Sequence, residues 1–177
     1  MMYSDSYKFV YLPMPKTGTS SICDILEKNY DAKIYPNQYG GRHIMTIPSW
    51  CKSYLTFTTI RSPLDRMFSI KKHLETWNGI KCNNFNKFMD DIMLPRKYWL
   101  CKNQSECLRG INVDFTLKLE NISKEFNKLP FVESKHIIPH INKNMMNIKI
   151  PKNCVRYSML WASDDFANFN YNCHTML

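Results

Sequence analysis

The sequence lacks both a long apolar run and a secretory leader. None of its 177 residues belongs to an 18-residue apolar stretch, and residues 1–8 are short and polar rather than basic and then apolar. It also has no Gly/Ser/Pro-rich linker, internal repeat or low-complexity tract. These absences predict a soluble, cytoplasmic protein without a membrane anchor, folded as one catalytic domain over residues 1–177.

The spacing of cysteines that marks a structural zinc site is missing as well. No CxxC motif occurs, and the number of cysteines is odd. We therefore expect no metal and mostly free thiols in a reducing compartment, with Cys101 and Cys107 able to pair only in an exported protein. The seven are Cys23, Cys51, Cys82, Cys101, Cys107, Cys154 and Cys173.

Acidic residues are few relative to basic ones. Lys and Arg total 24 against 15 Asp and Glu, and the net charge of +9 is spread along the chain rather than gathered in a tail. This excess suits an anionic cofactor and an anionic acceptor. No zinc-finger spacing, RNP block or basic recognition helix accompanies it, so nucleic acid is not an expected partner.

Residues 9–22, FVYLPMPKTGTSSI, combine an apolar strand, a turn and the start of a helix. Pro13 and Pro15 stop the strand, and Gly18 lets the backbone approach a ligand closely. The unpaired N–H groups of the helix start attract an anion, and Lys16 adds a positive charge beside them. The sequence therefore predicts a phosphate-binding turn. Four neighbouring residues offer hydroxyl groups for the phosphate or for capping the helix: Thr17, Thr19, Ser20 and Ser21.

A second strand–helix junction lies within residues 56–73, TFTTIRSPLDRMFSIKKH. The strand ends at Arg61, Ser62 is a good N-cap residue, and Pro63 fits the first helical position. Ser69 lies almost two turns beyond Ser62, so it returns to the same helix face about 10 Å along the axis. Arg61 and Ser69 are therefore expected to converge on one ligand.

The order of the expected elements predicts an α/β fold. Strands alternating with helices indicate a single P-loop-like domain with a central parallel β-sheet covered by helices on both faces. Lys16 and Arg61 then fall at strand carboxyl ends, where ligands of such sheets bind. We expect strands at 8–12, 33–35, 54–60 and 115–119, and helices at 20–29, 63–77, 84–93, 103–109, 121–128, 152–161 and 164–169.

The turn PKTGT closely resembles the 5′-phosphosulfate loop of sulfotransferases, which bind 3′-phosphoadenosine 5′-phosphosulfate (PAPS). The segment RSPLDRMFS is similar to their 3′-phosphate motif, commonly RNPYDRLVS, although Ser62 replaces the usual asparagine and Leu64 the aromatic residue. The resemblance implies a sulfotransferase fold and a PAPS site. Its cofactor-binding residues would be Pro15, Lys16, Thr17, Gly18, Thr19, Ser20, Ser21, Arg61 and Ser69.

Three later blocks look like those of the carbohydrate-type sulfotransferase branch. They are VDFTLKLENISKEFNKL at 113–129, IPHIN at 138–142 and DDFANFNY at 164–171. The resemblance then spans nearly the whole chain and implies sulfuryl transfer to an acceptor hydroxyl, preferably on a glycan. The order and spacing of the blocks carry this inference, because each block alone is weak.

A general base is needed to take the proton of the acceptor hydroxyl. His43 lies between the two phosphate motifs, and the ordinary histidine pKa near 6.5 suits proton transfer at neutral pH. Its segment is similar to the base-bearing segment of uronyl 2-O-sulfotransferases, so we expect His43 to be the base and Lys16 to stabilise the leaving group. The rivals for the base are Glu120, Glu75, His73 and His140.

Two other functions remain open at this point. A Walker A loop has its lysine after the second glycine, whereas Lys16 precedes Gly18 and no acidic strand end offers a magnesium ligand. A P-loop nucleotide kinase is therefore the less favoured enzyme, and a noncatalytic module binding adenosine 3′,5′-bisphosphate is the third reading. Arg66, in the second junction, is expected to be a salt-bridge or surface residue.

Overall fold

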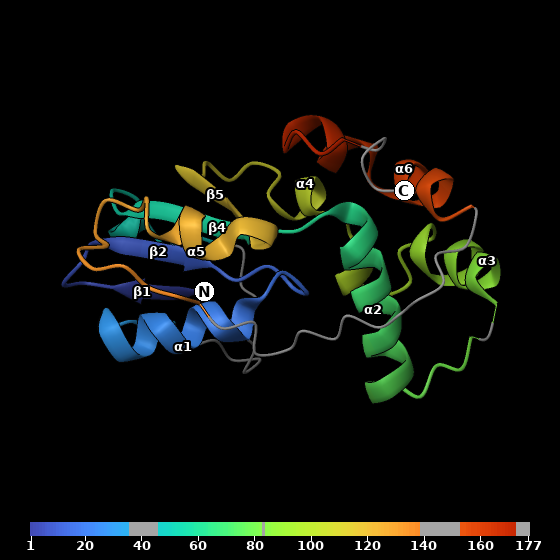
Figure 1. Ribbon diagram of the computed structural model, residues 1–177, viewed down its shortest axis with the longest axis horizontal. Coiled ribbons are helices and arrows are strands. Elements are labelled where there is room, and N and C mark those ends of the chain that lie inside the picture. The colour runs from blue at the N-terminus through green and yellow to red at the C-terminus, as the bar shows by residue number, and fades with distance from the viewer. Residues whose placement is uncertain (36–45, 83, 139–152, 173–177) are drawn as a thin grey trace. The chain divides into compact units, whose positions relative to one another are not determined.

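The protein is seen in a computed structural model that describes residues 1–35, 46–82, 84–138 and 153–172 (Figure 1). Its chain divides into two compact units, one formed by Met1–Arg61 and Gly110–Lys143 and the other by Ser62–Arg109 and Asn144–Leu177. Each unit has its own cluster of buried apolar side chains. The expectation of a single domain over the whole chain stays a prediction.

The first unit is built on a five-stranded mixed sheet in the order β3-β1-β2-β4-β5. Strands β2, β4 and β5 are parallel neighbours, as expected, whereas β1 runs antiparallel to both β2 and β3. The prediction of a wholly parallel sheet is therefore wrong at one edge. The strands are β1 (Met2–Ser4), β2 (Phe9–Leu12), β3 (Lys33–Ile34), β4 (Leu55–Ile60) and β5 (Phe115–Lys118).

Strand β1 was not expected, because residues 1–8 read as short and polar. Met1 and Met2 are nevertheless fully buried, and Met2 pairs with Tyr11 of β2 and Ile34 of β3. The strand thus owes its existence to neighbours on both sides rather than to its own pattern. Its pairing with β2 is local, across the turn at residues 5–8, whereas its pairing with β3 joins segments far apart in the sequence.

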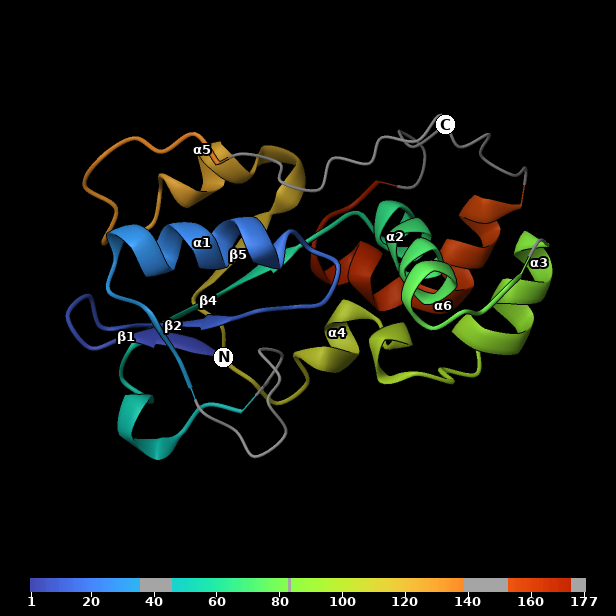
Figure 2. The same ribbon diagram turned by 90° about the horizontal axis from the view of Figure 1, so that it is seen from below.

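Helices α1 (Thr19–Asn29) and α5 (Ile122–Phe126) cover one face of this sheet (Figure 2). Alternate strand residues Phe9, Tyr11 and Phe57 point to that face, since successive side chains of a strand alternate sides. The aromatic rings of Tyr11 and Phe57 stack with their centroids 5.0 Å apart. The helices fill the same layer with Ile22, Ile25, Leu26, Ile122 and Phe126.

The second unit is helical. Its longest helices are α2 (Pro63–Trp77) and α6 (Cys154–Asn168), and shorter ones are α3 (Phe85–Phe88), the π-helical turn Met89–Met93 and α4 (Gln104–Cys107). Helix α2 has the predicted bounds because Ser62 caps it, accepting a hydrogen bond from the N–H of Asp65. The two helices predicted at 152–161 and 164–169 form the single element α6, broken by non-helical backbone at Ala162.

Single 3₁₀ turns occupy Ser49–Cys51, Trp99–Cys101 and Leu119–Asn121. Within the described ranges, no helix combines the length and the apolar character needed to cross a bilayer.

Candidate functional site

The predicted phosphate turn connects β2 to α1 in the first unit. Pro13 and Pro15 end the strand, and the backbone then takes positive φ at Lys16 (67°) and at Gly18 (81°). Glycine adopts such a conformation readily, whereas a lysine there is uncommon and costs energy. The turn is therefore a specific, strained backbone path at the lysine that the sequence singled out.

Gly18 is the N-cap residue of α1, and the helix has no side-chain cap. The expectation that a threonine or serine hydroxyl caps it is therefore wrong. The N–H groups of Ser21 and Ile22 both point back to the carbonyl of Gly18, at 3.1 and 3.4 Å. The N–H groups of Thr19 and Ser20 have no acceptor within the helix, as in any first turn, and are the ones suited to an anion.

A close approach of Leu119 is a second reason for the glycine. A Cβ atom added at Gly18 would clash with Cδ1 of Leu119, so the end of the Leu119 side chain would have to shift. Leu119 directly follows β5, so this contact joins the end of β5 to the turn that follows β2. The segment around Glu120 is thereby next to the turn in space, which the sequence blocks alone did not reveal.

The threonine hydroxyls of the turn point inward. Thr17 donates a hydrogen bond to the carbonyl of Met14 (2.9 Å), and Thr19 donates one to the same carbonyl (2.7 Å). The hydroxyl of Thr17 also contacts that of Thr59 on β4 (2.9 Å), which in turn contacts the hydroxyl of Tyr11 on β2 (2.8 Å). Thr17 and Thr19 therefore hold the turn together, while Ser20 is exposed and Ser21 is buried.

Three basic side chains and one acidic side chain, Glu120, lie where the parallel strands end. Leu12 of β2 is paired with Thr58 of β4, and Ile60 of β4 with Lys118 of β5, so the carboxyl ends of all three strands meet at one edge. Lys16, Arg61 and Lys118 lie at or just beyond these ends, and all three are half-buried. Cations at a strand edge next to open helix N–H groups make a setting for an anionic ligand.

Other predicted residues have separate outcomes. Ser69 is half-buried on α2 of the second unit, so its pairing with Arg61 of the first unit stays a prediction. His43 and its rival His140 lie outside the described residues. Glu75 forms an ion pair with Lys71 one helical turn away, so that candidate base already has a cationic partner.

A hollow of about 910 Å³ lies at the opposite edge of the same sheet. Its walls come from the amino ends of β4 and β5, with Tyr54, Leu55 and Phe115 among them. Because β4 has six residues, this edge is roughly 16 Å from the phosphate turn. Asp114, also in the wall, accepts a hydrogen bond from the N–H of Thr56 (2.7 Å), so it joins the starts of the two strands. The hollow is thus distinct from the predicted phosphate site.

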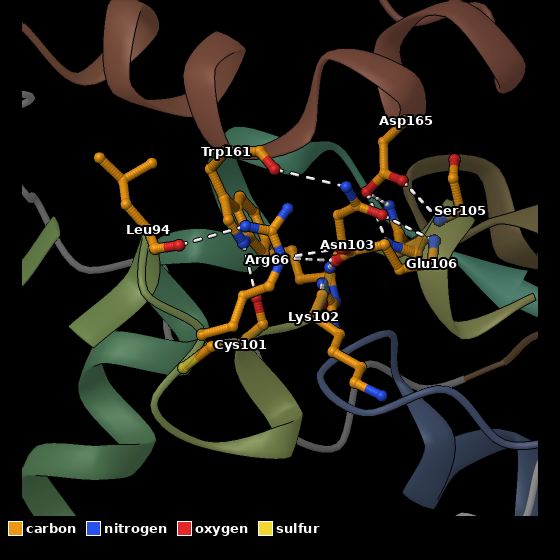
Figure 3. Close-up of polar contacts among 11 residues, drawn as sticks. Arg66, Leu94, Cys101, Lys102, Asn103, Ser105, Glu106, Trp161 and Asp165 are labelled. Atoms are coloured by element: carbon orange, nitrogen blue, oxygen red, sulfur yellow. Dashed lines mark hydrogen bonds and ion pairs between the residues drawn. The ribbon is translucent and has the colours of Figure 1, made fainter. Parts of the chain in front are cut away.

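The second unit contains a buried charged network that the sequence did not predict (Figure 3). Arg66 is fully buried, so its interpretation as a surface residue is wrong. Its guanidinium donates to the carbonyls of Lys102 (2.9 Å) and Leu100 (3.4 Å) and lies 5.4 Å from the ring centroid of Trp161. A cation placed against that ring and those carbonyls holds the 100–102 segment on α2.

Asp165 has an equally structural position. Its carboxylate accepts hydrogen bonds from the N–H groups of Gln104 (2.9 Å) and Ser105 (2.7 Å) and from the side chain of Gln104 (3.1 Å). It therefore caps the first turn of α4, next to the capping box that Asn103 and Glu106 form. The sequence signal for this role was the Asn-x-x-Glu spacing at 103–106, together with the DF of the last block.

The described part of the chain contains six of the seven cysteines but no cluster of possible metal ligands, and the expectation of no metal stays a prediction. Six cysteines, all except Cys173, are described, and none of the six forms a disulfide bond, Cys101 and Cys107 included. In the same part of the chain, no group of three His, Cys, Asp or Glu side chains is arranged to hold a metal ion.

No family model, curated protein or solved structure matches the chain. The case for function therefore rests on the turn and on the charged strand edge. Their defining features are the positive φ angles at Lys16 and Gly18, the open first turn of α1, and the cations at the ends of β2, β4 and β5.

Proposed function

We propose that the protein is a sulfotransferase that moves a sulfuryl group from PAPS to an acceptor hydroxyl on a carbohydrate. The observation that carries the proposal is the turn from β2 to α1, where Lys16 and Gly18 take positive φ next to the open first turn of a helix. Helix N-termini bind phosphate groups through their N–H groups and dipole. The turn sequence PKTGT adds the resemblance to the 5′-phosphosulfate loop.

The residues of the turn and of the strand edge fit an adenosine 3′,5′-bisphosphate moiety. The N–H groups of Thr19 and Ser20 would hold the 5′-phosphate, and Lys16 would stand beside it. Arg61, at the end of the neighbouring strand β4, would hold the 3′-phosphate. A second phosphate group accounts for a second cationic position at the same edge of the sheet.

Each chemical role follows from the charge that must be balanced. When bound, PAPS supplies the sulfuryl group, which the acceptor oxygen takes over as the bond from sulfur to the 5′-phosphate oxygen breaks. His43 would accept the proton of the acceptor hydroxyl. Lys16 would stabilise the negative charge that develops on the departing phosphate oxygen.

The contacts of the Thr17 hydroxyl do not favour the alternative function, a P-loop nucleotide kinase. In a GK[ST] loop the hydroxyl directly after the lysine binds Mg²⁺. Here the residue directly after Lys16 is Thr17, and its hydroxyl donates to the carbonyl of Met14 and is fully buried. The turn thus favours a phosphate ligand held by N–H groups and Lys16 over a magnesium nucleotide.

The test is calorimetric binding of adenosine 3′,5′-bisphosphate and of 5′-AMP in the absence of magnesium. We expect a clear preference for the bisphosphate, and we expect Arg61→Ala to weaken bisphosphate binding by at least tenfold while changing AMP binding little. Lys33→Ala is the control, because Lys33 is an exposed lysine of the same unit on strand β3, at the far edge of the sheet. Equal affinity for the two nucleotides, or no binding of either, would overturn the proposal.

A second measurement separates an enzyme from a noncatalytic binding module. His43→Ala should leave the affinity for the bisphosphate unchanged and abolish sulfuryl transfer to a panel of glycan acceptors. If wild-type protein binds the bisphosphate tightly but transfers nothing to any acceptor hydroxyl, the binding-module reading replaces the enzyme.

A further inference from the structure

A chain of buried hydroxyl groups lies beneath the phosphate turn. Tyr11 of β2, Thr59 of β4 and Thr17 of the turn are each fully buried, and their hydroxyl oxygens follow one another at 2.8 and 2.9 Å. The chain ends at the carbonyl of Met14, which accepts from Thr17 at 2.9 Å and from Thr19 at 2.7 Å. The hydroxyl chain thereby connects strands β2 and β4 to Thr17 and Met14, which lie on either side of Lys16 in the sequence.

The direction of every hydrogen bond in this chain follows from counting protons. A carbonyl only accepts, so the single hydroxyl proton of Thr17 is donated to Met14. Thr17 must then accept from Thr59, and Thr59, having used its own proton, must accept from Tyr11. Burial raises the pKa of Tyr11, and Cys23 raises it further, which outweighs the lowering by hydrogen bonds with the hydroxyls of Thr59 and Thr19. The phenol therefore stays neutral and keeps its proton.

We propose that Tyr11 and Thr59 are positioning residues that hold the turn at Lys16 in its phosphate-binding path, through a one-way chain of hydrogen bonds ending on Met14. The strained φ at Lys16 needs such support, because a lysine left to itself avoids that conformation. The proposal rests on the proposed function only for the identity of the ligand. It also assigns Thr17 to the support of the turn rather than to direct contact with phosphate.

The chain offers a closely matched control in the neighbouring residue. Thr58 and Thr59 are consecutive on β4, both fully buried, and both use their hydroxyl groups in hydrogen bonds. Thr58 donates to the carbonyl of Leu12 (2.7 Å) and has no part in the chain to the turn. Thr58→Val and Thr59→Val therefore make the same chemical change one residue apart.

The experiment measures two quantities on wild type, Tyr11→Phe, Thr59→Val, Thr59→Ser and Thr58→Val. The first is the dissociation constant for adenosine 3′,5′-bisphosphate. We expect about a tenfold weakening in Tyr11→Phe and Thr59→Val, near wild-type affinity in Thr59→Ser, which keeps a hydroxyl, and no change in Thr58→Val. The second is amide hydrogen exchange at Ser21 and Ile22, whose N–H groups both point to Gly18. It should be faster in the first two variants only.

The two quantities distinguish failure of this proposal from failure of the proposed function. If wild type does not bind the bisphosphate but the exchange pattern appears, the sulfotransferase assignment falls and the positioning chain stands. If Thr59→Val and Thr58→Val are alike in both affinity and exchange, the positioning chain is overturned, whatever the ligand. A Tyr11→Phe variant with wild-type affinity and exchange would overturn it as well.

Discussion

The two compact units each contain a buried polar network, and the networks differ in charge. In the first unit, the groups beneath the predicted phosphate turn are neutral hydroxyls of Tyr11, Thr59 and Thr17. In the second, the groups are the charged side chains of Arg66 and Asp165, bound mainly to backbone carbonyl and N–H groups. For Arg66 and Asp165, full burial of the charged side chain therefore indicates a structural role.

The difference also indicates where to look for chemistry. Arg66 and Asp165 are fully buried and already bound, so a ligand would have to displace strong hydrogen bonds to reach them. Lys16, Arg61 and Lys118 are only half-buried at strand ends, beside an uncapped helix start. A half-buried cation at the rim of the sheet is accessible to an anion from solvent, whereas Arg66 and Asp165 are not.

The largest loss of stability is expected from removing the buried carboxylate of Asp165 in the second unit. Asp165→Ala leaves the N–H groups of Gln104 and Ser105 without their acceptor, so we expect about 3 kcal/mol less free energy of unfolding. Urea denaturation followed by circular dichroism measures it. Asp164→Ala is the control, since Asp164 is the exposed neighbour with the same charge. Similar losses in the two variants would contradict a structural role for Asp165.

That loss should also exceed the loss caused by Thr59→Val in the hydroxyl network. Both substitutions remove hydrogen bonds from buried positions, but only Asp165 carries a charge whose bonds are charge-assisted and about twice as strong. Comparable values would remove the distinction between the two networks.

An intermediate loss of stability is expected from Gly18→Ala, which alters the turn between β2 and α1 in the first unit. Positive φ costs an alanine about 1–2 kcal/mol, and the new Cβ atom also meets Leu119. Gly110→Ala separates these causes, because Gly110 has a similar φ of 76° but open space around it. We expect Gly18→Ala to weaken bisphosphate binding strongly and Gly110→Ala to leave it unchanged.

Titration calorimetry and urea denaturation together check this prediction. Since Gly18→Ala has an added contact that Gly110→Ala lacks, its stability loss should be the larger. Replacing Leu119 by alanine in the Gly18→Ala background should recover part of that difference. No recovery would show that the contact with Leu119 does not limit the turn.

Local sequence predicted the parts of the fold that are determined locally. Ser62 and Pro63 set the start of α2, and the prolines around Met14 end β2 where the pattern indicated. The roles of Arg66 and Asp165 were missed because each depends on partners far away in sequence: Asp165 caps a helix 61 residues earlier. Strand β1 was missed although its partner β2 is close in sequence, because residues 1–8 show no strand pattern of their own. The motif predicts a turn suited to phosphate, but it does not indicate which hydroxyls of the turn face inward.

The smallest effect is expected in how the free energy of unfolding changes as pH falls. The charged network of the second unit and the hydroxyl network of the first unit should differ in this respect. Burial raises the pKa of Glu106, but hydrogen bonds from Arg96 and from the N–H of Asn103 outweigh it and hold the pKa below the ordinary value of 4.5. The unfolded state therefore takes up the proton first as pH falls, so the stability from this carboxylate is present above pH 4.5 and is lost as pH falls through the lowered pKa.

Glu106→Gln should remove this part of the acid dependence, by less than about 1 kcal/mol because the pair with Arg96 is partly exposed. Tyr11→Phe should not change the pH dependence of stability in acid, because a phenol whose pKa is raised stays neutral in both the folded and the unfolded state. Denaturant unfolding between about pH 3 and pH 7 measures both. If the two variants lose the same acid dependence, charge does not distinguish the two networks.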